Sequence, residues 1–271
     1  MRTLIIGDVV GRAGRNAVAQ HLPSLIEDLQ LDFVILNGEN ATHGFGLSPE
    51  HATGFFELGV DCIILGNHSF DRKEIIPMLK EDPRIIRPIN YPEGTPGKGM
   101  TILEGRDGHR VAVVQVLGRL FMNPEADNPF AAADQALEAL EGEKLDAVFV
   151  DVHAEATSEK MAFGHYLDGR VTVVEGTHTH VPTADIQILP HGTGFQTDVG
   201  MTGDYDSVIG MTKESSIERF TNVGARVKFG PAEAEATMCA LFIESDTETR
   251  LPTRLEPVRI GGRLSQAIPA V

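Results

Sequence analysis

The feature that most constrains the fold of this chain is a series of short apolar runs, each followed at once by polar residues. The clearest run covers 62–65 and stops at Gly66, which is followed by Asn67 and His68. Short apolar runs bounded by turn residues are typical of buried strands, and glycine marks the start of a loop. Similar runs end beside other polar side chains: Asp8, Glu39, Asn40, His153, His178 and His180.

Helical patterns separate these runs through about residue 180. Val18, Leu22 and Leu25 recur at helical spacing, and Ser48 followed by Pro49 is typical of a helix start. Further helices are expected over 71–79, 131–140 and 157–169. Beyond residue 180 strands dominate, with runs at 186–189, 225–229, 236–243 and 255–260. With no linker or repeat, the pattern predicts an α/β fold built on two sheets, as a single domain over residues 1–271.

The charge balance narrows the classes of partner. The chain has 39 acidic and 23 basic residues, a formal charge of −16, which disfavours binding to a long phosphate backbone. A small anionic substrate held by metal ions remains compatible with this charge. Cys62 and Cys239 both lie in apolar runs, so a disulfide framework is not expected. No signal-peptide pattern or membrane-spanning run is apparent, and the expected compartment is the cytoplasm.

The polar residues after the strands are predicted to form one metal centre. In an open α/β sheet, ligands bind beyond the carboxyl ends of the strands, where these side chains would meet. Their oxygen and nitrogen atoms suit Mn, Fe, Zn or similar divalent ions and do not select one of them. We expect two divalent or mixed-valence ions per chain, Fe or Mn before Zn. Two ions about 3.5–4 Å apart, bridged by a carboxylate, would use the whole set. The candidate metal ligands are Asp8, Glu39, Asn40, Asn67, His153, His178 and His180.

Each of these residues also has a purely structural interpretation. Asp8 could cap a helix, Asn67 could serve a turn, and His153 could be a hydrogen-bonded core residue. His178 and His180 could be surface positions of a strand. Convergence on one sheet edge favours the metal centre over these alternatives. The His-x-His spacing would place both rings on one face of an extended segment, so that each ring meets a different ion.

His68 is predicted to act in catalysis. Two ions can share a hydroxide at neutral pH and bind the oxygens of a phosphate. The leaving alkoxide then needs a proton, which His68, next to the ligand Asn67, is placed to donate as a general acid. The alternative is that His68 is itself a ligand or lies in a third shell around the ions.

These motifs resemble the calcineurin-like metallophosphoesterase superfamily in order and spacing. The resemblance rests on Gly7-Asp8, on 66–68, on a lone His153 and on 176–180. The superfamily's usual Asp-x-His is Asp8-Val-Val here, and its Gly-Asp is replaced by the Asn-Gly-Glu-Asn of 37–40. Both departures, together with 197–203 and 206–211, are similar to the YmdB-type bacterial subfamily.

The resemblance implies a four-layer α/β/β/α sandwich of two mixed sheets flanked by helices. It also implies hydrolysis of phosphodiesters, above all 2′,3′-cyclic nucleotides, and assembly into homo-oligomers. Glu39 would bridge the two ions, and His68 would be the general acid. One ion would take Asp8, Glu39, Asn40 and His180, and the other would take Glu39, Asn67, His153 and His178.

The residue that orients His68 is left open by the sequence. The superfamily usually has an acidic residue after Gly-Asn-His, where this chain has Ser69. Asp71 could take its place, although a helix-capping role for Asp71 is favoured.

The predicted function is a dinuclear metal-dependent phosphodiesterase, in which a metal-bound hydroxide attacks the substrate and His68 acts as general acid. RNA ends are a further substrate class to consider. The alternatives are a phosphomonoesterase and a non-catalytic metal-binding regulatory protein that acts on RNA or a protein partner. A nucleotide-binding Rossmann domain is disfavoured, because 7–14 lacks the Gly-x-Gly-x-x-Gly pattern.

Overall fold

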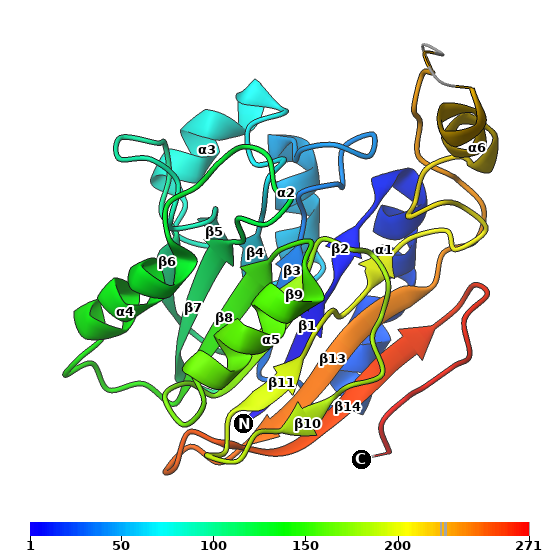
Figure 1. Ribbon diagram of the computed structural model, residues 1–271. Coiled ribbons are helices and arrows are strands. Elements are labelled where there is room, and N and C mark those ends of the chain that lie inside the picture. Colours follow the sequence, from blue (N-terminus) through cyan, green and yellow to red (C-terminus); the bar gives the residue numbers. More distant parts are fainter. Residues whose placement is uncertain (223, 225–226, 271) are drawn as a thin grey trace.

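Two mixed sheets lie face to face at the centre of the computed structural model, which describes residues 1–222, 224 and 227–270 (Figure 1). The first sheet has the order β14-β13-β1-β3-β4-β5. Strands β1, β3, β4 and β5 run parallel to one another, and β13 is antiparallel to both of its neighbours, β1 and β14. Its strands are β1 (Arg2–Ile6), β3 (Phe33–Asn37), β4 (Cys62–Ile64), β5 (Ile85–Ile86), β13 (Met238–Ser245) and β14 (Pro252–Ile260).

The second sheet has the order β10-β11-β9-β8-β7-β6, with β7, β8, β9 and β11 parallel. Its strands are β6 (Met100–Glu104), β7 (Arg110–Leu117), β8 (Ala147–His153), β9 (Val173–Thr177), β10 (Gln187–Ile188) and β11 (Gly194–Gln196). A small parallel pair, β2 (Asp8–Val9) with β12 (Met201–Thr202), continues the chain beyond β1.

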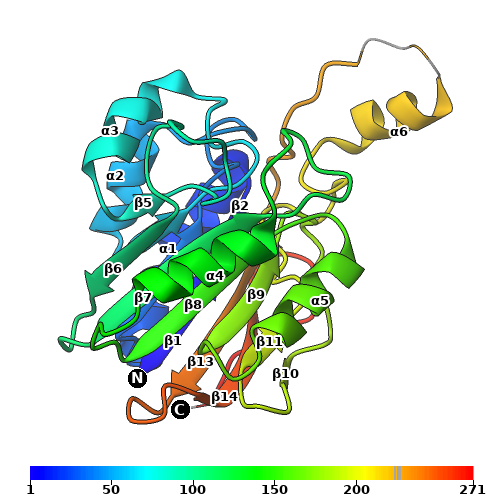
Figure 2. The same ribbon diagram turned by 60° about the vertical axis from the view of Figure 1, so that its left-hand side comes forward.

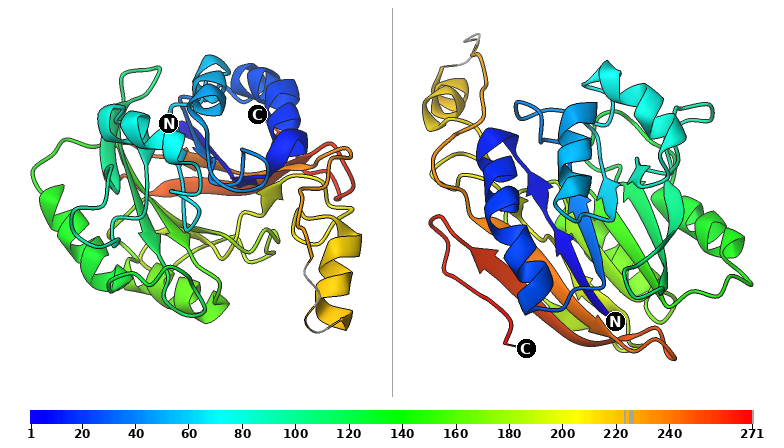
Figure 3. Two further views of the ribbon diagram at one scale, coloured as in Figure 1. Left: turned by 90° about the horizontal axis from the view of Figure 1, so that it is seen from above. Right: turned by 180° about the vertical axis from the view of Figure 1, so that it is seen from behind.

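Helices cover the outer face of each sheet. On the first sheet lie α1 (Gly11–Asp28), α2 (Pro49–Glu57) and α3 (Ile76–Glu81), as the view from behind shows (Figure 3). On the second lie α4 (Pro129–Ala139) and α5 (Thr157–Tyr166) (Figure 2). Inward-facing residues such as Ile35, Ile64 and Phe149 form a buried core between the sheets. The predicted four-layer sandwich is therefore confirmed.

The helix starts show whether Asp8 caps a helix, which was its alternative interpretation. Ser48 caps α2 by accepting a hydrogen bond from the His51 backbone at 3.3 Å, as its sequence predicts. The N-cap of α1 is Val10, without a side-chain cap. Asp8 is therefore not a capping residue, and its carboxylate is available for another role.

The structure departs from the predicted elements in the last third of the chain. The strand expected over 225–229 is not formed at 227–229, and residues 225 and 226 lie outside the described residues. A helix that the apolar pattern does not predict, α6 (Lys213–Thr221), stands away from the sheets beyond the carboxyl ends of the first-sheet strands (Figure 1). None of the described helices is long and apolar enough to cross a membrane.

Candidate metal centre and active site

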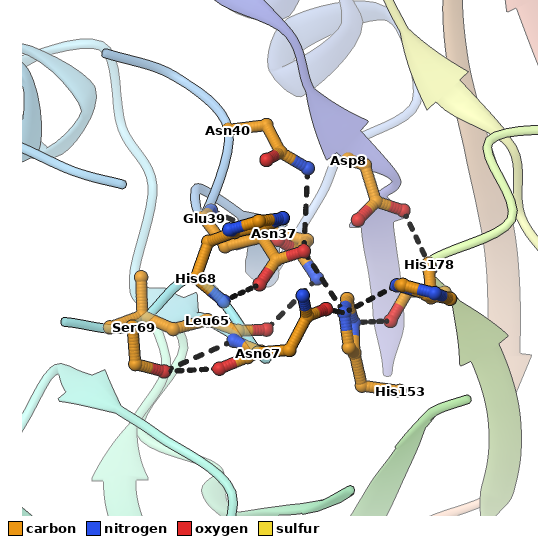
Figure 4. A network of polar contacts seen from close by, with 12 residues as sticks. Asp8, Asn37, Glu39, Asn40, Leu65, Asn67, His68, Ser69, His153 and His178 are labelled. Atoms are coloured by element: carbon orange, nitrogen blue, oxygen red, sulfur yellow. Dashed lines mark hydrogen bonds and ion pairs between the residues drawn. The ribbon is translucent and has the colours of Figure 1, made fainter. Parts of the chain in front are cut away.

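Four predicted site residues lie beyond the carboxyl ends of first-sheet strands. Asp8 begins β2 directly after β1, Glu39 and Asn40 follow β3, and Asn67 follows β4 (Figure 4). Asp8, Glu39 and Asn40 are buried, although all three carry polar side chains. Burying such groups costs free energy unless they are paired, so their gathering in one place needs a compensating partner.

The remaining predicted ligands come from the second sheet. His153 is the last residue of β8, and His178 and His180 follow β9. The His178 backbone N–H donates to Asp8 Oδ2 at 3.1 Å, which ties the two sheets together at the site. The structure therefore brings all seven predicted ligand side chains to one place.

The first cluster surrounds the Nε2 atom of His153. This nitrogen lies 2.9 Å from Asn67 Oδ1, 2.9 Å from Glu39 Oε1 and 3.2 Å from His178 Nδ1. One ring nitrogen has at most one proton, which cannot satisfy three neighbours at once. A cation between them can, and Glu39, His153 and His178 are spaced to hold a metal ion.

The second cluster meets the first at Glu39 Oε1. His180 Nε2 lies 3.8 Å from Asp8 Oδ1 and 3.2 Å from the Asn40 amide nitrogen, which itself lies 3.3 Å from Glu39 Oε1. Asp8 Oδ1 is buried and has no hydrogen-bond partner among the described residues. A cation here would satisfy Asp8, and a half-turn of the Asn40 amide would offer it the oxygen.

His180 and His178 each have a polar contact at the outer ring nitrogen, and the inner nitrogen faces the cluster. His180 Nδ1 donates to the Ile209 carbonyl at 2.8 Å, and His178 Nε2 lies 3.3 Å from Glu155 Oε2.

His153 also has a polar partner at its outer ring nitrogen, in a chain of two hydrogen bonds. His153 Nδ1 lies 2.8 Å from Thr177 Oγ1, whose own proton goes to Asp151 Oδ1 at 2.8 Å. The Thr177 hydroxyl therefore accepts from His153 Nδ1, which leaves Nε2 as the ring nitrogen that faces the cluster. Outer partners of this kind set the tautomer of metal-binding histidines.

The local electrostatics favour a positive charge at the centre. Burial alone would raise the pKa of Glu39, but the His153 imidazolium outweighs it and holds this pKa well below its usual value. Burial lowers the pKa of His153, yet the carboxylate of Glu39 raises it overall to about 9. Burial beside His153 lowers the pKa of His178 to about 3, so this ring is neutral, the form that binds metals.

The backbone of the His-x-His segment is not the extended segment that the spacing predicts. β9 ends at Thr177, and His178 and His180 have φ values of 92° and 66°. Positive φ is strained for residues other than glycine and is concentrated at functional sites. The two rings still reach different clusters, as predicted, but a bent backbone rather than strand alternation separates them.

His68 lies beside the centre without being part of either cluster. Its backbone N–H donates to Glu39 Oε2 at 2.9 Å, and its ring packs edge-on against Phe45, with ring centres 5.0 Å apart. Its Nδ1 lies 2.8 Å from Asp71 Oδ2. Asp71 therefore orients His68, and the favoured helix-capping role is wrong, because the helical segment begins after Arg72 and has no side-chain cap.

Ser69, at the position where the superfamily is usually acidic, holds the turn instead. Its hydroxyl donates to the Gly66 carbonyl at 2.5 Å and accepts from the Gly66 backbone N–H at 3.3 Å. Tyr91 donates to the same carbonyl at 3.0 Å. The turn that presents Asn67 and His68 is thus fixed from two sides.

Gly66 leaves room for the centre, which leads to a first prediction. A Cβ atom at this position would overlap Glu39 Oε2 and His153 Nε2. Gly66→Ala is expected to displace both groups, so that metal content and hydrolysis fall while the far-ultraviolet dichroism stays native. Gly54→Ala, in α2 with open space around it, is the matched control, and α-helical content and activity should be unchanged there. Normal metal content in Gly66→Ala would contradict this account of the site.

A buried ion pair behind the His-x-His segment was not predicted from the sequence. Lys160 on α5 is fully buried and donates to Asp198 Oδ2 at 2.7 Å and to the Thr177 carbonyl at 2.6 Å. Asp198 also accepts from the Thr179 backbone N–H and hydroxyl, at 3.1 and 2.7 Å. The pair therefore holds the backbone on both sides of His178.

The fold is that of the metallophosphoesterases. A 5′-nucleotidase precursor from Thermus thermophilus shares it with a TM-score of 0.56 at 14% sequence identity, over 96% of this chain and 54% of that one. More specifically, residues 4–258 match the model of the family described as YmdB-like protein, and the chain belongs to that family.

Related sequences and one related crystal structure match this chain over nearly its whole length. A 2′,3′-cyclic-nucleotide 2′-phosphodiesterase from Bacillus subtilis (strain 168) is 46% identical, over 96% of this chain and 97% of its own. A putative phosphatase/phosphodiesterase from Mycoplasma pneumoniae is 37% identical, over 96% of this chain and 93% of its own. The crystal structure of a hypothetical protein from Thermus thermophilus has a TM-score of 0.90 at 47% identity, over 97% of this chain and all (100%) of that one. The resemblance inferred from the motifs is confirmed.

Proposed function

We propose that this protein is a dinuclear metal-dependent phosphodiesterase that hydrolyses 2′,3′-cyclic nucleotides or related phosphodiesters. The observation that carries the proposal is the pairing of two ligand clusters, joined by Glu39, with a histidine outside them that Asp71 orients. The name of the Bacillus subtilis relative supports this substrate class.

The residues present fit two cations. The first cluster would hold one through Glu39, Asn67, His153 and His178, and the second would hold another through Asp8, Glu39, Asn40 and His180. Two such ions, with Fe or Mn expected from the mixed oxygen and nitrogen donors, would bind phosphate oxygens and activate water.

His68 has the hydrogen bonds expected of a general acid. Nδ1 bonds to Asp71, so Nε2 is left to face the cavity that His68 lines. A new bond forms between a water oxygen and phosphorus, and the bond from phosphorus to O2′ breaks. His68 gives its proton to O2′, and the product is a nucleoside 3′-monophosphate.

The second candidate activity is hydrolysis of a phosphomonoester, because the Mycoplasma pneumoniae relative is named for both activities. A screen of cyclic nucleotides, linear diesters and monoesters on metal-loaded protein separates these cases. Preference for a cyclic diester supports the proposal, and preference for monoesters makes the protein a phosphatase. A complete lack of turnover would favour a metal-binding regulator.

Metal stoichiometry gives a second prediction. Glu39→Gln is expected to lower the content of both ions, because Glu39 reaches both clusters, whereas His180→Gln should lower only one. Elemental analysis of the purified variants measures this difference. A single ion per chain that is insensitive to Glu39→Gln would contradict the dinuclear arrangement.

Other expectations concern the protein as a whole. The buried core shared by both sheets supports a single domain over residues 1–271. Action on RNA ends, homo-oligomer formation and a cytoplasmic location stay predictions.

A further inference from the structure

A cavity of about 520 Å³ opens directly from the metal centre. Glu39, Asn40, His68, His178 and His180 form its polar end. This volume falls in the range of small-molecule sites. A phosphate at the two clusters would fill only part of it, so the substrate has room to extend away from its phosphate.

Helix α6 and Phe229 beyond it form another part of the cavity lining. Ser216, Arg219 and Phe220 line the cavity from α6, at the spacing of one helix face, and Phe229 lines it from beyond the helix. Phe220 is 79% exposed, an unusual state for a phenylalanine. The helix that stands apart from the sheets (Figure 1) thus contributes an aromatic side chain to the active-site cavity.

Arg219 adds a positive charge to this part of the lining. Its guanidinium lies over the Phe229 ring, 5.4 Å from the ring centre. Among the described residues that line the cavity, Arg219 is the one with a permanent positive charge. The chain as a whole has a net charge of −16. Flat guanidinium and phenyl surfaces are the groups on which nucleobases stack in single-stranded nucleic-acid sites.

We propose that Arg219 and Phe220 of α6 form the nucleobase subsite, which binds the base of the substrate while its phosphate lies at the metal centre. This assignment rests on the proposed function, because it takes the substrate to be a nucleotide. It also gives α6, whose residues are otherwise mostly exposed, a role in substrate selection. The polar residues at the metal centre would bind the phosphate, and Arg219 and Phe220 would select the diester by its base.

The test compares two substrates in the metal-loaded protein. One is adenosine 2′,3′-cyclic phosphate, and the other is 1-O-methylribofuranose 2,3-cyclic phosphate, which lacks the base. Phe220→Ala is expected to raise KM for the nucleotide about 10-fold, as lost base stacking does, with little change in kcat. Arg219→Gln should act in the same direction. Neither variant should change kcat/KM for the base-free substrate.

Ile217→Ala is the matched control, because Ile217 is an exposed residue of α6 that does not line the cavity. It should leave both substrates unaffected. Equal losses on the two substrates in Phe220→Ala, or no loss on the nucleotide, would overturn the base subsite.

A binding measurement separates this proposal from the proposed function. Calorimetry compares adenosine 3′-monophosphate with ribose 3-phosphate on the same metal-loaded proteins. If the base contributes affinity in the wild type and not in Phe220→Ala, the subsite stands even for a protein that turns over no diester. If both ligands bind the wild type equally, the subsite is wrong, whatever the hydrolysis assays show.

Discussion

Replacing His68 with alanine is expected to lower turnover of a 2′,3′-cyclic nucleotide by about 10²- to 10⁴-fold, the contribution typical of general acid catalysis. The reason is that the leaving oxygen loses its proton donor, whereas neither ligand cluster includes the His68 ring. Metal content should therefore stay at the wild-type level. Steady-state kinetics and elemental analysis on the same preparation measure the two quantities.

Two further variants sharpen this result. Asp71→Asn keeps a hydrogen-bonding group 2.8 Å from His68 Nδ1 but removes its charge, so a smaller loss is expected than for His68→Ala. His109, which pairs with Asp107 in the hairpin between β6 and β7, supplies the matched histidine–aspartate control, and His109→Ala should be fully active. Retained turnover in His68→Ala would sink the general-acid assignment, and a simultaneous loss of metal would make His68 a ligand.

Asp198→Asn is expected to cost about 3–5 kcal/mol of unfolding free energy, because it leaves the buried Lys160 ammonium without its negative partner. The amide keeps the shape of the carboxylate, so the loss reports the charge rather than a cavity. Metal affinity should fall too, since Thr179 between the two histidines loses its anionic acceptor. Urea unfolding and metal titration provide the readouts.

The surface pair of Arg170 and Asp134 serves as the control, and Asp134→Asn should unfold at nearly the wild-type urea concentration. Combining Asp198→Asn with Lys160→Met should recover part of the lost stability, because no buried charge then remains unpaired. If Asp198→Asn alone unfolded like the wild type, the ion pair would have no structural role.

The strand ends could be predicted because their physical cause is local. A buried strand needs an apolar run, and a glycine or polar residue must follow where the backbone leaves the sheet. That rule places Asp8, Glu39, Asn67 and His153 at strand ends from residue type alone, although the expected single sheet edge is in fact the edges of two facing sheets. The chemistry of the donor atoms then suggests a metal centre.

The parts that could not be predicted depend on distant partners or on backbone conformation. Asp198 pairs with Lys160, which lies 38 residues earlier in the chain. His180 donates to the backbone carbonyl of Ile209, and a backbone acceptor cannot be recognised from the residue type. The positive φ of His178 is likewise imposed by its surroundings. Helix α6 has exposed apolar residues and little buried surface, so it lacks the periodic pattern that reveals other helices.

The origin of the seven candidate ligand side chains would have a consequence for metal choice. All the oxygen donors come from the first sheet and all the nitrogen donors from the second. The distance between the oxygen and nitrogen donors is therefore set by how closely the two sheets pack, through residues such as Ile35, Ile64 and Phe149. Because ions differ in the bond lengths and donors they prefer, a methyl group added or removed in this apolar interface would tune which metal the enzyme prefers, although it touches no ligand. Selectivity for the ion is then a property of the hydrophobic core.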